Sequence, residues 1–173
     1  MGKKGALWVK MPFGEWLWTT VNDAPNKTIY FNSSYQHGVD EKRRLQIPAK
    51  WRPEEQGVEY TVMVWLKHSA GACLRVLPPA EMAKLMADIE AMPKGDEKKT
   101  YLKRFIGSES VQVAVDKAGR ICLPDDMARK AGIKDEAVLV GLLDRFEIWN
   151  PERFETVKAA DAALAHEAFK FME

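Results

Sequence analysis

A ten-residue segment occurs twice in this chain and limits the folds that the chain can adopt. Residues 39–48 read Val-Asp-Glu-Lys-Arg-Arg-Leu-Gln-Ile-Pro, and residues 115–124 read Val-Asp-Lys-Ala-Gly-Arg-Ile-Cys-Leu-Pro. At an offset of 76 residues the copies share Val, Asp, Arg and Pro, and aliphatic residues exchange at two further positions. Internal similarity of this kind predicts a fold built from two similar units.

The similarity continues after each copy at an offset of 72 residues, so that each unit ends in an apolar strand, a proline and an amphipathic helix. The first unit carries four extra residues, which we place in the loop at residues 68–71. Two units are too few for a solenoid. We therefore expect one pseudo-twofold domain made of two halves. The aligned residues are Leu74, Val76, Pro79, Met82 and Leu85 with Phe146, Ile148, Pro151, Phe154 and Val157.

Bulk properties are those of an ordinary globular chain of 173 residues, long enough for one well-buried domain or two small ones. The formal net charge is only +1, so any polyanionic partner must be attracted by local clusters of charge. Cys73 and Cys122 have no metal-type spacing and are interpreted as small buried residues of a reducing compartment. No apolar run reaches the length of a membrane helix or a signal core, so we expect a cytoplasmic protein without a membrane partner.

Residues 1–29 stand apart from the two units. Apolar residues alternate at positions 7–13, and Trp16 and Trp18 follow at a spacing of two, which is typical of strands, although Pro12 excludes a central strand. Two interpretations of the tryptophans stay open. The segment is either a flap over the protein's own surface or a subunit interface, or it is a patch that binds another partner.

Within the units, the patterns predict strands and helices in a repeated order. We expect a strand over residues 28–35, and two hairpins, 58–66 with 72–77 and 137–143 with 146–149. Helices are expected to begin at Pro79 and Pro151, the second capped by Asn150, and another helix is expected over residues 96–106. Asp125 is expected to cap a short helix that ends at Gly132.

The repeated segment itself reads as a strand, a tight polar turn, a strand and a proline. An Asp at the head of such a turn accepts backbone N–H bonds and fixes the loop. An Arg four residues later can leave the turn with its guanidinium free to bind a phosphate or a guanine edge. The alternative is an internal Asp–Arg pair on a solvated turn.

Local charge favours the first copy as a nucleic-acid contact. Residues 41–52 contain five basic side chains and one acid, whereas acids lie among the basic residues of the second copy. Two such turns related by a pseudo-twofold axis would present paired basic loops to a duplex groove. The candidate DNA contacts are Lys42, Arg43, Arg44, Lys50, Arg52, Lys117 and Arg120, and the acids that fix the loops are Asp40 and Asp116.

The sequence resembles the MraZ family of bacterial transcriptional regulators, within the AbrB/SpoVT swapped-hairpin superfamily. The segment Phe-Asn-Ser-Ser-Tyr-Gln-His-Gly-Val-Asp-Glu-Lys-Arg-Arg-Leu-Gln-Ile-Pro at 31–48 is similar to the opening of these proteins. The second copy, with Val-Leu-Val-Gly at 138–141 and Phe-Glu-Ile-Trp at 146–149, is similar to their second half. The resemblance covers residues 30–160, and its paired D-x-x-x-R motifs are specific in combination.

This resemblance implies an α+β fold, mainly β, in which two swapped-hairpin AbrB-like halves form one pseudo-twofold barrel with peripheral helices. It also implies a double-stranded DNA-binding repressor of the division and cell wall gene cluster. Such a protein is a nucleoid-associated, ring-shaped homo-oligomer that binds short direct repeats upstream of its own operon. The corresponding division of the chain is an extension at 1–29, halves at 30–80 and 109–151, connecting helices at 81–108 and a C-terminal helix at 152–173.

Two features depart from the family pattern. The family has glycine at the position of Arg43, which suggests a backbone with positive φ, where a non-glycine residue costs on the order of 1 kcal/mol. Either this turn is rebuilt or Arg43 is an added DNA contact. Residues 1–29 have no counterpart in the family.

Other classes of function find little support in the sequence. The histidines at 37, 68 and 166 have no metal-ligand spacing, and there is no nucleophile elbow or phosphate-binding glycine loop. We therefore predict no enzyme activity, metal, cofactor or small-molecule substrate. The remaining alternative is an oligomeric scaffold in which the N-terminal tryptophans, Trp65 and Trp149 form interfaces and the basic loops are incidental.

Overall fold

The computed structural model describes residues 5–10, 16–21, 28–66 and 69–172. At the start of the chain, β1 (Gly5–Lys10) pairs antiparallel with β2 (Trp16–Val21) as a separate two-stranded sheet. The strand-like pattern of this segment is thus confirmed for its backbone. Whether the tryptophans cover the protein or bind a partner lies outside the described side chains.

Both predicted hairpins are present and form the centre of a six-stranded sheet. They are β5 (Glu59–Trp65) with β6 (Cys73–Leu77), and β9 (Glu136–Gly141) with β10 (Phe146–Trp149). The hairpins meet where β6 pairs with β10, with Arg75 opposite Glu147. Because these two residues are equivalent at the offset of 72, the pseudo-twofold axis passes through this pair.

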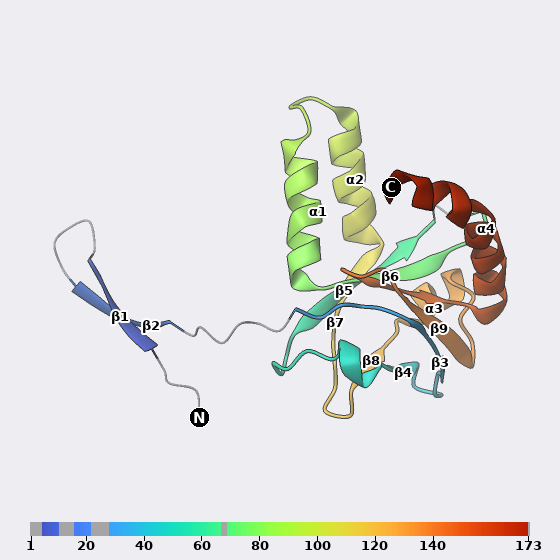
Figure 1. Cartoon of the computed structure of the whole chain (residues 1–173), viewed down its shortest axis with the longest axis horizontal. Helices are drawn as coiled ribbons and strands as arrows, with labels where there is room; N and C mark the ends of the chain where they lie inside the picture. Colours follow the sequence, from blue (N-terminus) through green and yellow to red (C-terminus); the bar gives the residue numbers. More distant parts are fainter. Residues whose placement is uncertain (1–4, 11–15, 22–27, 67–68, 173) are drawn as a thin grey trace.

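The two halves exchange their first strands. β3 (Ser34–Gly38) belongs to the first half and pairs with β9, whereas β7 (Ser110–Ala114) belongs to the second half and pairs with β5. The resulting order is β3-β9-β10-β6-β5-β7. Each half therefore completes the hairpin of the other, and the two halves form one body rather than two independent units (Figure 1).

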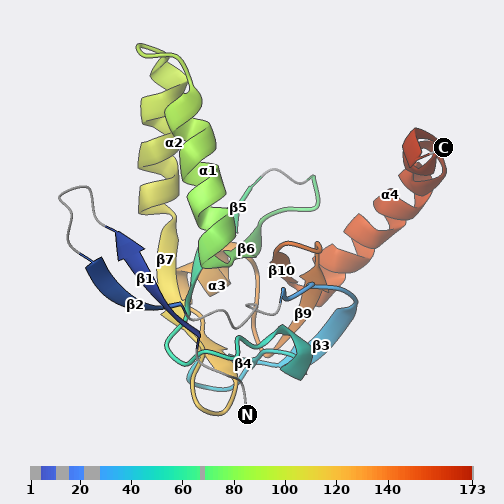
Figure 2. The same cartoon turned by 60° about the vertical axis from the view of Figure 1, so that its left-hand side comes forward.

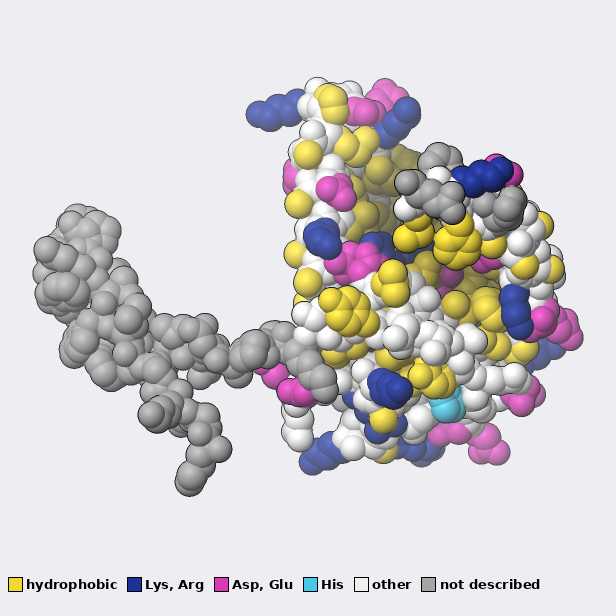
Figure 3. Space-filling view, in the orientation of Figure 1, with side chains coloured by type: hydrophobic (Ala, Val, Ile, Leu, Met, Phe, Trp, Pro, Cys, Tyr) yellow, Lys and Arg dark blue, Asp and Glu magenta, His cyan; other side chains and the backbone are white. Residues whose placement is uncertain are grey.

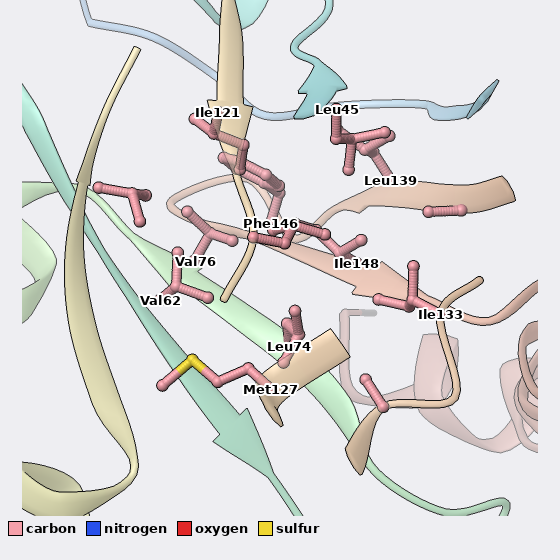
Figure 4. Packing of buried hydrophobic residues seen from close by; sticks show 14 of the residues in the cluster. Leu45, Val62, Leu74, Val76, Ile121, Met127, Ile133, Leu139, Phe146 and Ile148 are labelled. Carbon is pink, nitrogen blue, oxygen red and sulfur yellow. The ribbon is translucent and has the colours of Figure 1, made fainter. Parts of the chain in front are cut away.

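A short two-stranded sheet, here called the ribbon, lies on the opposite side of the core from the six-stranded sheet. It consists of β4 (Arg44–Gln46) and β8 (Arg120–Cys122), with Leu45 opposite Ile121. Both central side chains are almost fully buried, and Figure 4 shows them above Phe146 and Val76 of the sheet. The α+β, mainly β character is confirmed. The described strands form an open sheet plus this ribbon rather than a closed barrel, because β3 and β7 each pair on one side only.

The helices follow the predicted order. Pro79 and Pro151 each begin a helix, α1 (Pro79–Ala91) and α4 (Pro151–Phe169), and α2 (Glu97–Ser108) returns antiparallel to α1 (Figure 2). Asn150 caps α4 by accepting a hydrogen bond from the backbone N–H of Arg153. Short helices η1 (Ala49–Trp51) and α3 (Asp125–Lys130) follow the repeated prolines, and η2 (Lys170–Met172) ends the described chain.

Three sequence expectations need correction. The strand expected over 28–35 begins only at Ser34, because Phe31 turns into the core and Ser33 adopts a positive φ of 73°. Asp125 is the first residue of α3 rather than its cap, and Pro124 holds the cap position. Cys73 is buried as expected, but Cys122 is exposed because it lies on the outer face of the ribbon. Among the described residues, no helix has the length and apolarity needed to cross a bilayer.

Candidate nucleic-acid interface

The first copy of the repeat forms a tight loop between β3 and β4, here called loop 1 (residues 39–45). One carboxylate oxygen of Asp40 accepts hydrogen bonds from the backbone N–H groups of Lys42 and Arg44, both at 2.9 Å. The Asp40 carbonyl accepts a bond from the N–H of Arg43. The predicted role of Asp40 in fixing the turn therefore has a direct structural basis.

Loop 2 (residues 115–121) repeats this geometry. Asp116 accepts bonds from the N–H groups of Ala118 at 2.8 Å and Arg120 at 2.9 Å, and its carbonyl accepts a bond from the N–H of Gly119. The backbone φ is 77° at Gly119 and 58° at Arg43, the equivalent residue of loop 1. The positive φ predicted for position 43 is thus confirmed, and the turn is not rebuilt to accommodate arginine.

Backbone bonds between the two halves hold the loops side by side. The N–H of Ile47 donates to the carbonyl of Gly119, and the N–H of Leu123 donates to the carbonyl of Arg43, both at 2.9 Å. These two bonds are related by the offset of 76 residues. With the β4–β8 pairing, they fix the distance between the loops, which groove recognition requires.

Side chains of the ribbon also reach across to the opposite loop. The Gln46 amide donates to the carbonyls of Ala118 and Gly119, at 3.0 and 2.9 Å. At the equivalent position in the other half, the Cys122 thiol lies 3.4 Å from the Lys42 carbonyl. The sequence analysis did not single out Gln46, because its partners lie more than 70 residues away and come near only through the strand exchange.

Each loop contains an Asp–Arg ion pair, which was the alternative left open by the sequence. The Nε of Arg44 donates to Asp40 at 2.7 Å, and that of Arg120 donates to Asp116 at 2.9 Å. Arg120 also places a terminal nitrogen 2.9 Å from Asp116. Pairing through Nε orients a guanidinium without consuming all of its five donors, so both arginines retain N–H groups for a ligand.

The loop hydrogen bonds lower the pKa of both aspartates below the ordinary value. For Asp40 the main cause is the backbone N–H of Arg44, reinforced by the Arg44 guanidinium. For Asp116 it is the backbone N–H of Arg120, followed by that residue's side chain. Both carboxylates are therefore charged at neutral pH and hold the loops in their bonded form.

The predicted contacts divide into two groups by the direction of their side chains. Lys42, Lys50 and Lys117 are exposed, and Arg44 and Arg120 are partly exposed beside their aspartates. Figures 1 and 2 place β4, β8 and their loops at the end of the molecule opposite the tip of the α1–α2 hairpin, and Figure 3 shows Lys and Arg side chains gathered along this edge.

Arg43 and Arg52 form the second group, because their guanidinium groups donate to backbone carbonyls, whereas Arg44 and Arg120 donate to the aspartate of their own loop. Arg43 donates to Asp125 at 3.0 Å and to the Lys134 carbonyl at 3.2 Å. Arg52 donates to the Ile47 carbonyl at 2.9 Å and lies against loop 2. Among the described residues, no cluster of His, Cys, Asp and Glu is arranged to hold a metal ion.

Known proteins are similar to this chain over most of its length. Residues 106–170 match the family model described as "MraZ protein, putative antitoxin-like". Proteins named transcriptional regulator MraZ from Leuconostoc citreum and Roseiflexus castenholzii are each 33% identical to this chain, over 76% and 78% of it and 89% and 91% of their own lengths. The protein of the same name from Rickettsia rickettsii is 33% identical over 79% of this chain and 92% of its own length.

The fold and the paired loops thus define an α+β protein built from two similar halves, and the relatives that it matches are named transcriptional regulators. This chain belongs to the MraZ family.

Proposed function

We propose that this chain is a sequence-specific regulator of transcription that binds double-stranded DNA through loops 1 and 2. The observation that carries the proposal is the cross-bonded pair of loops, which present basic side chains on one edge of the molecule at a fixed separation. Phosphate contacts position such a protein, and forked arginines read base edges. The proposed direct contacts are Lys42, Arg44, Lys50, Lys117 and Arg120.

By analogy with the family, the proposed target is a set of short direct repeats upstream of the protein's own operon in the division and cell wall gene cluster, and the proposed effect is repression. A ring-shaped homo-oligomer would place several pairs of loops against successive repeats. Exposed apolar side chains on the C-terminal half of α4 and in η2 support self-association, because Leu164, Phe169 and Met172 are 64%, 67% and 81% exposed.

The same apolar residues are the observation that favours the second candidate, an oligomeric scaffold without DNA binding. The tryptophans that suggested it from the sequence give it less support. Trp149 is buried in the protein's own core, and Trp65 is half-buried with the Arg75 guanidinium 3.7 Å from its ring centre. A scaffold predicts weak DNA binding that does not depend on sequence.

Fluorescence anisotropy separates the two candidates. The probe is the duplex immediately upstream of the gene, compared with a scrambled duplex across a series of salt concentrations. The regulator is expected to prefer the native duplex, with a log–log salt slope that steepens by about 0.9 for each phosphate contact. Equal, weak binding of both duplexes would move the function to the scaffold.

Two matched variants locate the site. Arg44→Ala is expected to weaken binding to the native duplex more than Arg120→Ala, because loop 1 is the more basic loop and Arg120 is held by Asp116 through two nitrogens. One lost base contact corresponds to a loss of about 10- to 100-fold. Arg104→Ala, on the solvated face of α2, removes the same charge far from the loops and is the control. Equal losses for the two loop variants would refute the assignment to loop 1.

A further inference from the structure

Arg43 occupies a position that its own backbone disfavours, and its side chain, which is 32% exposed, reaches across to the second half of the molecule. The φ of 58° is a left-handed conformation in which non-glycine residues are strained. The guanidinium reaches the other half of the molecule, where it donates to the Asp125 carboxylate and to the carbonyls of Ile133 and Lys134. A side chain kept at a strained position and bonded to three groups of the opposite half has a defined role there.

Loop 2 is supported by an arginine that approaches from the opposite direction. A Cβ atom on Gly119 would lie 2.3 Å from the Nε of Arg52, so the glycine leaves the space in which Arg52 packs. Arg52 is anchored by its bond to the Ile47 carbonyl. Loop 2 therefore has a glycine in its own turn and is contacted by an arginine that follows η1 in the first half.

Loop 1 has the reverse arrangement. The residue equivalent to Arg52 at the offset of 76 is Ala128, which is fully buried in α3 and too short to reach the turn. The residue equivalent to Gly119 is Arg43. One guanidinium thus lies between each loop and the opposite half. At loop 2 it belongs to Arg52 of the opposite half, and at loop 1 it belongs to Arg43 of the turn itself.

The surroundings of the two guanidinium groups also differ. Between loop 2 and residues 52–58 lies a pocket of about 550 Å³, lined by Arg52, Glu55, Gly57 and Lys117 among others. Beside loop 1, the Arg43 guanidinium extends to the segment that follows α3 and bonds to its carbonyls. The ion pair with Asp125, the first residue of α3, also ties the Arg43 guanidinium to the second half.

We propose that Arg43 is a positioning residue that braces loop 1 against the second half, as Arg52 braces loop 2. Arg43 then sets the direction in which Arg44 and Lys42 meet DNA, but Arg43 itself does not touch the DNA. This inference rests on the proposed function. It assigns to Arg43 a role different from the direct contact expected from the sequence.

Three variants of the full-length protein test the brace against direct contact. Arg43→Gly removes the side chain and suits the positive φ, so it is expected to fold. Arg43→Lys keeps the charge and the backbone strain but loses the planar fork that serves three acceptors. Asp125→Asn removes the ionic partner of Arg43.

The brace predicts that all three variants bind the native duplex about tenfold more weakly at every salt concentration, with an unchanged salt slope. A direct phosphate contact predicts a slope lower by about 0.9 for Arg43→Gly, recovery by Arg43→Lys, and tighter binding by Asp125→Asn, because that variant releases a cation. Either of the last two results, recovery by lysine or tighter binding, would overturn the brace. Arg104→Ala is the charge-matched control.

A second measurement needs no DNA. Hydrogen exchange of the Asp40 and Leu123 amides, which bond within and across loop 1, is expected to quicken in Arg43→Gly and Arg43→Lys but not in Arg104→Ala. Unchanged exchange would reject the brace, whatever the DNA result. If exchange quickens and yet neither Arg44→Ala nor any Arg43 variant alters DNA binding, the brace stands and the proposed function fails.

Discussion

At the scale of single residues, one carboxylate per loop organises the candidate site. Asp40 and Asp116 each hold two backbone N–H groups and the Nε of the arginine four residues later. Removing either acid would leave two turn amides to water and release the arginine from its orientation. The aspartates thus control how the arginines are presented, although they carry the charge opposite to that of a DNA contact.

The acid titration of these residues provides a test. Because both pKa values are lowered from 3.8, the stabilising effect of each aspartate is fully present above that value and is lost as the pH falls through the lowered pKa. We therefore expect loop geometry to stay constant from neutral pH down to about pH 4. Carbon-detected NMR of the two carboxyl groups measures this directly. A carboxyl that titrates at or above its ordinary value would contradict the observed bonding.

At the scale of elements, the ribbon β4–β8 couples the core to the loops. Leu45 and Ile121 face each other on the ribbon and pack into the main core with Phe146 and Val76 (Figure 4). Both loops begin or end on these strands. Core packing below the ribbon therefore fixes the position of the basic side chains above it.

Truncating one of these core residues should affect both stability and function. Leu45→Ala is expected to lower the free energy of unfolding by about 2–5 kcal/mol, since Leu45 is fully buried. Chemical denaturation gives this value, and Leu66→Ala is the matched control, because Leu66 is 60% exposed. At a temperature where Leu45→Ala remains folded, weaker binding to the native duplex is also expected. A loss smaller than about 1 kcal/mol would show that the ribbon is only loosely attached to the core.

Much of this arrangement could be predicted from the sequence, because the repeat specified it twice. The hairpins, the helix start at Pro79, the cap at Asn150 and the turn-fixing aspartates are all local features, and the positive φ at Arg43 followed from the glycine that the family has at this position. The groups that the Arg43 and Arg52 side chains contact could not be predicted. Arg43, for example, bonds to Asp125, which is 82 residues away in sequence and comes near only through the exchange of strands. The prediction of a strand over residues 28–35 was wrong for a similar reason, because β3 begins only at Ser34. Tertiary packing draws Phe31 into the core against its strand propensity.

At the scale of the whole molecule, the surfaces that we propose for DNA binding and for assembly lie on different elements. The basic edge is formed by loops 1 and 2, whereas the exposed apolar residues lie mainly on α4 and η2. Figure 3 also shows hydrophobic side chains in the hollow between the α1–α2 hairpin and the C-terminal end of α4. An oligomer built through this apolar region would leave the loops accessible.

The separation of these surfaces gives a prediction for residues 1–28, which precede the first half and carry Trp8, Trp16 and Trp18. Deleting them is expected to change the size of the assembly or its solubility while the affinity per pair of loops stays within about twofold, because backbone bonds between residues 43 and 123 and between residues 47 and 119 already hold the loops together. Light scattering coupled to size exclusion measures the assembly, and anisotropy at matched protomer concentration measures the affinity. A deletion variant that assembles like the full chain but no longer binds the native duplex would place the extension on the DNA instead, and the two loops would then be an incomplete site.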